Sequence, residues 1–193
     1  SNIIHGDCFN SNIVEELKTL SQKNLDIGLL NPPYSQKDKS ELEFVEQLLS
    51  VINKGGKAVV VVPMSCAIGT KFKEVRKRLF EKHTLKAVFS MPDDVFYPTG
   101  TNVCVMVWEA HKPHNSAIKT FFGYCKDDGF VKRKKLGRVD AFNTWEAIKL
   151  EWLSLYFNSE EKIGITAKQS VNYNDEWLCE AYMKTDYSKL TQD

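Results

Sequence analysis

Four consecutive residues, Asn31, Pro32, Pro33 and Tyr34, are the part of this chain best suited to chemistry. They follow residues 25–30, a short apolar run that indicates a buried strand, and two adjacent prolines end a strand because neither can donate to a sheet ladder. The tetrapeptide is therefore predicted to leave the carboxyl end of a strand, which is the edge where open α/β sheets bind ligands.

The residue types of this loop fit the activation of an amino group attached to an aromatic ring. Such a nitrogen is a poor nucleophile because its lone pair is delocalised into the ring. The Asn31 side-chain oxygen and the Pro32 carbonyl could each accept one N–H and direct the lone pair at an electrophilic methyl group. The prolines stiffen these acceptors, and Tyr34 offers a flat face for a flipped base. The alternative is a tight strand exit with Tyr34 as a half-buried surface aromatic.

Three other groups of residues could take part in binding. Asp7 follows a glycine at the predicted end of a strand, where its carboxylate could accept from an amino group or a ribose hydroxyl, although this is also an ordinary turn position. Phe96 and Tyr97 lie in a predicted loop, where an aromatic ring could stack on a base or pack beneath the loop. Residues 132–135, with Arg138 nearby, could neutralise phosphates, but we favour a solvated turn.

No metal site is predicted. The pair His111 and His114 has metal-like spacing only if a third ligand exists, and the intervening Pro113 argues against a helix, so both are expected at the surface. The five cysteines are odd in number, scattered and without any Cys-x-x-Cys, which argues against a disulfide framework or a zinc ribbon.

The elements that must position these residues alternate between helix and strand. Helical spacing appears within residues 13–20, 45–52 and 72–80, and a capping box is predicted at Ser40 and Glu43. Residues 57–63 lack polar alternation, as expected of a parallel strand covered on both faces. Two further strands, residues 85–91 and 103–108, could form an antiparallel hairpin.

The rest of the chain carries weaker signals. A linker is predicted at residues 111–115, a short strand at 118–124, and a helix that opens at residues 143–146. We therefore divide the chain into a catalytic part, residues 1–110, and a small C-terminal α+β extension, residues 111–193. The extension is expected to pack on the sheet or to dock a partner subunit.

Five short motifs together resemble a known family. They are Gly6-Asp7, Asn31-Pro32-Pro33-Tyr34, the Gly-Gly-Lys-Ala-Val-Val-Val-Val-Pro run at 55–63, Met91-Pro92 through Phe96, and Thr99-Gly100-Thr101 before an apolar strand. On these motifs residues 3–108 resemble the catalytic domain of the adenine-N6 DNA methyltransferases, in particular the modification subunits of type I restriction systems.

The resemblance implies an α/β fold, the C-terminal half of a Rossmann-like S-adenosylmethionine-dependent sheet that is mostly parallel and closes with an antiparallel hairpin. It implies that Asp7 lies near the cofactor's adenine, that Asn31 also contacts the cofactor, and that the Asn-Pro-Pro-Tyr loop grips the target adenine. Phe96 would help Tyr34 to sandwich that base. Expected partners are DNA and the specificity and restriction subunits.

One departure from the family pattern concerns the cofactor. The family carries a glycine-rich loop after its first strand, yet this sequence contains no Gly-x-Gly and begins with Ser rather than Met. We therefore expect a fragment that holds half a cofactor site and is inactive when isolated.

Composition adds little to this prediction. The 193 residues are 42% apolar, enough for one sizeable core, and the net charge of +1 provides no general attraction for nucleic acid. No apolar run reaches membrane-spanning length and no signal pattern is present, so no membrane partner is predicted and the cytoplasm is the expected location.

Two alternatives to adenine methylation in DNA remain open. The same loop chemistry would suit a glutamine side-chain amide or an amino group on an RNA base. A third interpretation is a non-catalytic assembly module of a restriction–modification complex, which docks a subunit through the segment after residue 110.

Overall fold

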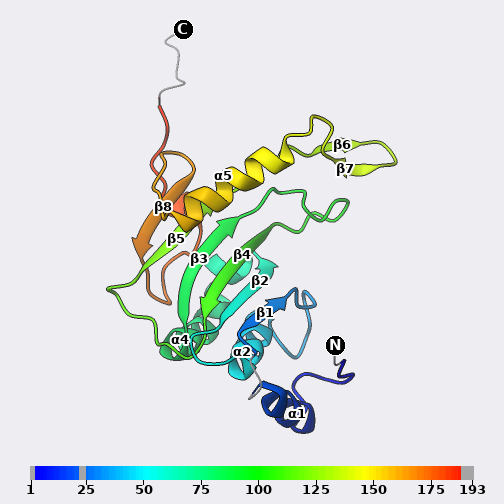
Figure 1. Ribbon diagram of the computed structural model, residues 1–193, viewed down its shortest axis with the longest axis vertical. Helices are drawn as coiled ribbons and strands as arrows, with labels where there is room; N and C mark the ends of the chain where they lie inside the picture. The colour runs from blue at the N-terminus through cyan, green and yellow to red at the C-terminus, as the bar shows by residue number, and fades with distance from the viewer. Residues whose placement is uncertain (1–2, 22–24, 188–193) are drawn as a thin grey trace.

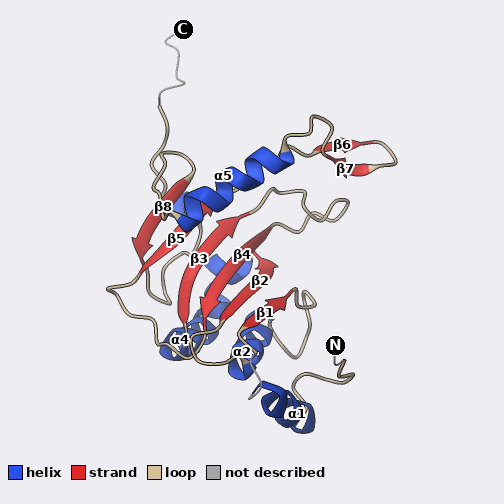
Figure 2. Ribbon diagram, viewed as in Figure 1, coloured by secondary structure: helices blue, strands red, loops and turns tan. Residues whose placement is uncertain are grey.

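The apolar strands of this sequence assemble into one six-stranded sheet (Figures 1 and 2). The computed structural model describes residues 3–21 and 25–187. The sheet contains β1 (Ile27–Leu30), β2 (Lys57–Pro63), β4 (Val103–Glu109), β3 (Thr84–Ser90), β5 (Lys119–Tyr124) and β8 (Thr166–Ser170), in that spatial order. A separate two-stranded hairpin is formed by β6 (Val131–Arg133) and β7 (Gly137–Val139).

Helices connect the strands. They are α1 (Ser11–Ser21), α2 (Glu41–Val51), α3 (Ser65–Ile68), α4 (Lys73–Lys82) and α5 (Trp145–Phe157), with short 3-10 turns at Thr70–Phe72 and Cys179–Ala181. The predicted capping box is confirmed at the start of α2, where the Glu43 carboxylate accepts from the Ser40 backbone N–H (2.8 Å) and hydroxyl (2.9 Å). No helix in the described ranges has the length and apolar character that crossing a membrane requires.

Most strands of the sheet run in one direction. β1 pairs in parallel with β2, and β3 pairs in parallel with β5, whereas β4 runs antiparallel to both β2 and β3. The mostly parallel sheet and the predicted β3–β4 hairpin are therefore confirmed. The hairpin does not lie at the end of the sheet, because β5 and β8 continue the sheet beyond β3.

The main core lies on one face of the sheet, beneath α2, α3 and α4. Ala58, Val60 and Val62 of β2 point into it and are fully buried, together with the large ring of Trp108. A second, smaller cluster lies on the opposite face, where Leu155 of α5 packs on β3, β4 and β5. Burial of these apolar side chains stabilises the packing of helices on both faces of the sheet, by about 25 cal/mol for each Å² of apolar surface removed from water.

Two sequence predictions about strands were wrong. No strand exists within residues 3–10, where Asp7 was placed at a strand end; these residues form a loop before α1. β1 was predicted to be buried, yet Ile27 and Leu29 are 73% and 77% exposed. The apolar pattern did not reveal that β1 is an edge strand in this sheet, with only one face covered by α2.

Candidate active site

The four residues 31–34 leave the carboxyl end of β1, as predicted. Asn31 and Pro33 are exposed, Pro32 is buried, and Tyr34 is half-buried. The buried proline ring anchors the loop against the protein, while the Asn31 side chain stays accessible to a substrate. The carboxyl ends of β1, β2, β3 and β5 share this edge of the sheet because these strands run in the same direction.

The Tyr34 hydroxyl fixes the loop internally. It donates to Oδ1 of Asn31 at 2.9 Å and lies 3.4 Å from the carbonyl oxygen of Val61 on β2. Burial, with smaller contributions from Cys104, Cys66 and Glu41, raises the pKa of Tyr34 to about 12. The hydroxyl is therefore protonated at neutral pH and acts as a donor that orients the Asn31 amide.

Phe96 is brought to the same place from the loop between β3 and β4. Its ring meets the Tyr34 ring edge to face, with centroids 6.1 Å apart and an interplanar angle of 82°. Because the rings are nearly perpendicular, they do not form two parallel walls around a base in this arrangement. The neighbouring Tyr97 is 51% exposed and lies beneath the Lys132 ammonium, 5.4 Å from the ring centroid.

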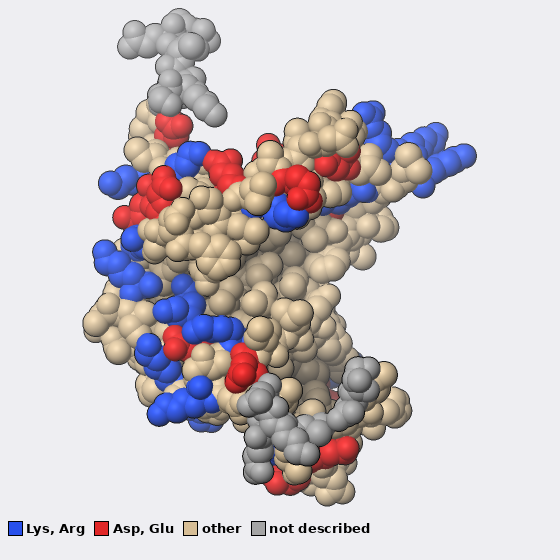
Figure 3. Space-filling view, viewed as in Figure 1, with Lys and Arg blue, Asp and Glu red and all other residues tan. Residues whose placement is uncertain are grey.

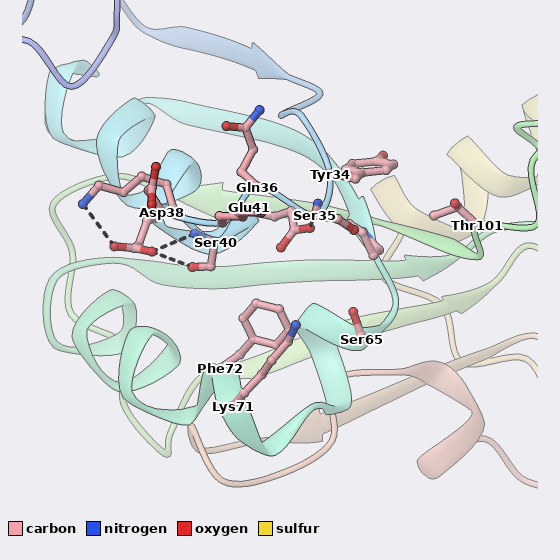
Figure 4. A pocket seen from close by; sticks show the side chains of 14 residues that line it. Tyr34, Ser35, Gln36, Asp38, Ser40, Glu41, Ser65, Lys71, Phe72 and Thr101 are labelled. Carbon is pink, nitrogen blue, oxygen red and sulfur yellow. Dashed lines mark hydrogen bonds and ion pairs between the residues drawn. The ribbon is translucent and has the colours of Figure 1, made fainter.

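A polar cavity of about 600 Å³ lies beside Tyr34, and Figure 4 shows side chains of the residues that line it. Ser35 has a positive φ of 58°, and its backbone N–H donates at 2.9 Å to the carboxylate of Glu41, the first residue of α2. Glu41 is only 8% exposed, so this buried carboxylate holds the backbone directly after Tyr34. Lys71 and Thr101 also line the cavity.

Ser35, Glu41, Lys71 and Thr101 were not among the predicted site residues. A signal for Glu41 existed, because the capping box at Ser40 and Glu43 fixes where α2 begins. Nothing local in the sequence marks Lys71, which reaches the cavity only through the fold.

Asp7 makes a local turn contact. Its exposed carboxylate accepts through Oδ1 from the backbone N–H of Phe9 at 2.9 Å, as a turn residue does. Phe9 in turn contacts Phe44 of α2 with ring centroids 4.8 Å apart, which attaches this segment to the fold. Within the described residues, no hydrogen bond or ion pair joins Asp7 to residues 31–34.

The histidines lie in different surroundings. No group of three metal-binding side chains occurs in the part of the chain that the structure describes. His111 is exposed, but His114 is half-buried and its ring stacks on Phe80 at a centroid distance of 4.1 Å, so the expectation that both lie at the surface was wrong for His114. His83 is 2% exposed, and its Nδ1 accepts from the His111 backbone N–H at 3.0 Å.

Comparison with known proteins places the chain in a family. Residues 35–143, more than half of the chain, match the model of the family described as N-6 DNA Methylase, and the match begins directly after Tyr34. The type II restriction enzyme and methyltransferase RM.BcgI of Heyndrickxia coagulans is 33% identical in an alignment 168 residues long that covers 82% of this chain and 26% of that protein. The chain thus spans about a quarter of the length of this curated relative.

Solved structures share the fold. The methyltransferase subunit of a type I restriction–modification system from Streptococcus thermophilus superposes with a TM-score of 0.66 and 18% identity, over 83% of this chain and 38% of that one. A chain from a structural study of complex assembly in the type I restriction–modification system gives a TM-score of 0.61 and 18% identity, over 95% of this chain and 43% of that one. The predicted methyltransferase fold is confirmed, and the chain belongs to the N-6 DNA methylase family.

Proposed function

We propose that this protein transfers a methyl group from S-adenosylmethionine to the N6 amino group of adenine in DNA, as part of a restriction–modification system. The observation that carries the proposal is the exposed Asn31 amide, oriented by the Tyr34 hydroxyl at the carboxyl edge of the sheet in a chain of the N-6 DNA methylase family.

Each residue of the loop has a defined task in this proposal. Oδ1 of Asn31 and the carbonyl oxygen of Pro32 accept the two N–H groups of the adenine, which localises the nitrogen lone pair toward the methyl donor. The Tyr34 ring supports the flipped base, and Phe96 borders it at the edge-to-face contact. Pro33 restricts Pro32, so the acceptors are held before substrate binds.

Two residues of this chain suit contacts with S-adenosylmethionine. Asp7 is exposed, and within the described residues only its Oδ1 has a donor, so Oδ2 is available to a ribose hydroxyl or an amino group. Asn31 lies beside the acceptor nitrogen and could also contact the cofactor. When bound, the cofactor supplies a methyl group on a positively charged sulfur, an already activated donor. The task of the chain is then orientation and charge placement.

Partners follow from the same proposal. DNA is the substrate, and specificity and restriction subunits are the expected protein partners in a cytoplasmic complex. We assign catalysis to residues 1–110 and regard residues 111–193 as an extension of the catalytic part.

Replacement of Asn31 tests the proposal directly. In the intact protein, Asn31→Ala is expected to lower turnover about a hundredfold or more, because a preorganised acceptor is lost. The measurement is transfer of labelled methyl groups from S-adenosylmethionine to DNA. The matched control is Asn174→Ala, which removes an exposed amide in the segment after β8 and should leave turnover unchanged.

The choice of acceptor distinguishes this proposal from its alternatives. DNA, RNA and glutamine-containing protein acceptors are compared with the same labelled cofactor. Methylation of RNA or protein in preference to DNA would reassign the substrate, and near-normal DNA methylation by Asn31→Ala would refute the role of the loop. Subunit binding without any methyl transfer would favour an assembly module.

A further inference from the structure

The β6–β7 hairpin carries a run of positive charge away from the main sheet. Lys132 to Lys135 form the end of β6 and the turn, and the turn closes with positive φ angles at Lys135 (66°) and Gly137 (75°). Figure 1 shows the hairpin projecting beyond the loop between β3 and β4, and Figure 3 shows Lys and Arg side chains gathered at its tip.

Two of the basic residues hold the hairpin in place. The Arg138 guanidinium lies 2.9 Å from a carboxylate oxygen of Asp94 and 2.7 Å from one of Asp128, and it is only 14% exposed. Lys132 also pairs with Asp94, at 3.3 Å. An isolated two-stranded hairpin is marginal in water. The ion pairs supply the contacts that such a hairpin lacks, and the Arg138 guanidinium carbon also lies 5.3 Å from the centroid of the Phe130 ring. Together these contacts fix the orientation of the β6–β7 hairpin.

The remaining three basic residues have no such partner. Arg133, Lys134 and Lys135 are all exposed, and no ion pair in the described part of the chain includes any of them. Three adjacent positive charges repel one another, so binding of an anionic surface outside the chain would relieve this repulsion and stabilise the folded hairpin. The net charge of the chain is only +1, which makes this tip a local feature rather than part of a general basic field.

The hairpin is attached close to the proposed base site. Asp94, which anchors Arg138 and Lys132, lies two residues before Phe96, and Phe96 contacts Tyr34. Lys132 additionally lies over the Tyr97 ring. The hairpin is thus attached to the loop that borders the proposed base site, and its tip extends outward from the same edge of the sheet (Figure 1).

We propose that Arg133, Lys134 and Lys135 bind the phosphate backbone of the DNA duplex next to the target adenine. The hairpin supplies affinity without reading sequence, because phosphate contacts are independent of the bases. This inference rests on the proposed function and adds a binding surface to it. The three residues lie at the exposed end of β6 and in the turn after it, as the solvated turn favoured from sequence predicts, and the proposal adds a ligand for them.

A triple variant tests the inference in the intact protein. Arg133→Ala, Lys134→Ala and Lys135→Ala together should weaken binding of a duplex on the order of tenfold or more at low salt. The slope of log affinity against log salt concentration should fall in magnitude by about 2 to 3, since each phosphate contact contributes about 0.9.

The matched control removes three other exposed lysines. Lys54, Lys77 and Lys119 have no ion pair in the described residues, and Lys54 and Lys119 lie near the opposite, amino-terminal edge of β2 and β5. Their triple alanine variant should bind DNA with the parental salt slope.

The outcomes separate the two proposals. If the parent methylates and binds DNA but the hairpin variant keeps the parental affinity and slope, only the hairpin inference fails. The same conclusion follows if the hairpin variant loses a protein partner instead of DNA. If the parent neither binds nor methylates DNA, both proposals fail.

Discussion

The side chains of Asn31 and Tyr34 form the smallest unit of the proposed site. The 2.9 Å hydrogen bond between them uses Oδ1 of Asn31, the same atom that we propose accepts an N–H from adenine. A carbonyl-type oxygen has two lone pairs, so it can accept from both donors at once. The tyrosine therefore has two separable tasks, orientation through its hydroxyl and stacking through its ring.

Variants of Tyr34 should separate these tasks. Tyr34→Phe removes the donor to Asn31 and keeps the ring, so we expect turnover to fall about tenfold at saturating DNA, for the loss of one orienting hydrogen bond. Tyr34→Ala also removes the stacking surface, worth roughly 1–3 kcal/mol per base, and should weaken binding of the extruded adenine accordingly. Single-turnover rates and fluorescence of 2-aminopurine at the target position measure the two effects.

The matched control is Tyr97→Phe, which removes a hydroxyl from the same edge of the sheet without touching Asn31. If Tyr34→Phe reduced base binding as much as Tyr34→Ala does, the division of tasks would be wrong.

At this scale the sequence predicted the position of the loop correctly. Asn31, Pro32 and Tyr34 emerge where the proline pair ends β1, because proline restrictions are local properties of the chain. The meeting of Phe96 with Tyr34 was expected from the family resemblance only, and the geometry is edge to face. Lys71 was missed because a long-range arrangement brings it to the cavity.

Among the elements, α2 has the most direct influence on the loop. The first turn of α2 makes two separate contacts: the Glu43 carboxylate forms the capping box with Ser40, and the Glu41 carboxylate accepts from the Ser35 N–H. A carboxylate is also favoured at the amino end of a helix by the helix dipole. The helix thereby holds the backbone directly after Tyr34.

Neighbouring glutamates of α2 should have different effects. Glu41→Ala frees the Ser35 N–H and should lower turnover on the order of tenfold or more through misplacement of Tyr34, whereas Glu41→Gln keeps an acceptor and should retain most activity. Glu43→Ala loses the capping box and should cost about 1 kcal/mol of stability with little effect on turnover.

Turnover and denaturant unfolding of the three variants provide the comparison, at a temperature where all are folded. Equal losses of turnover in Glu41→Ala and Glu43→Ala would show that helix stability, not the Ser35 contact, supports the loop.

The element types were largely predictable, since helical and strand periodicities are set by neighbouring residues. The order of the strands was not, because pairing of β4 with β2 and continuation of the sheet through β5 and β8 depend on contacts distant in sequence. The exposure of β1 was missed for the same reason.

For the whole molecule, the buried His83 makes stability depend on pH. Burial, with smaller contributions from His111 and Lys82, lowers the pKa of His83 to about 4 from 6.5. Below pH 6.5 the unfolded chain binds a proton that the folded chain cannot accept until about pH 4. The free energy of unfolding should therefore fall by about 2 kcal/mol between pH 7 and pH 5.

The variant His83→Asn, which keeps an acceptor for the His111 N–H but does not titrate, should remove the part of this dependence that His83 contributes, while His114, whose pKa burial also lowers, keeps its own contribution. Denaturant unfolding at pH 7 and pH 5 measures it, and the exposed His5→Asn serves as the control. The range stays above pH 4.5 because Glu43 and Glu46, whose pKa values are lowered, lose their stabilisation only below it. A parental slope in His83→Asn would contradict the assignment.

The central place of β4 has a consequence for how the chain is made. As a ribosome releases the polypeptide, β1 and β2 can pair early. The other edge of β2 and the adjacent edge of β3 both pair with β4, so they stay unpaired until residues 103–109 emerge. Until then the apolar side chains of Val60, Val62 and Val88 have an incomplete sheet to pack in, and nascent segments of this kind are prone to aggregate. Chaperone binding to the nascent chain is therefore expected to matter most in the interval between synthesis of β2 and synthesis of β4.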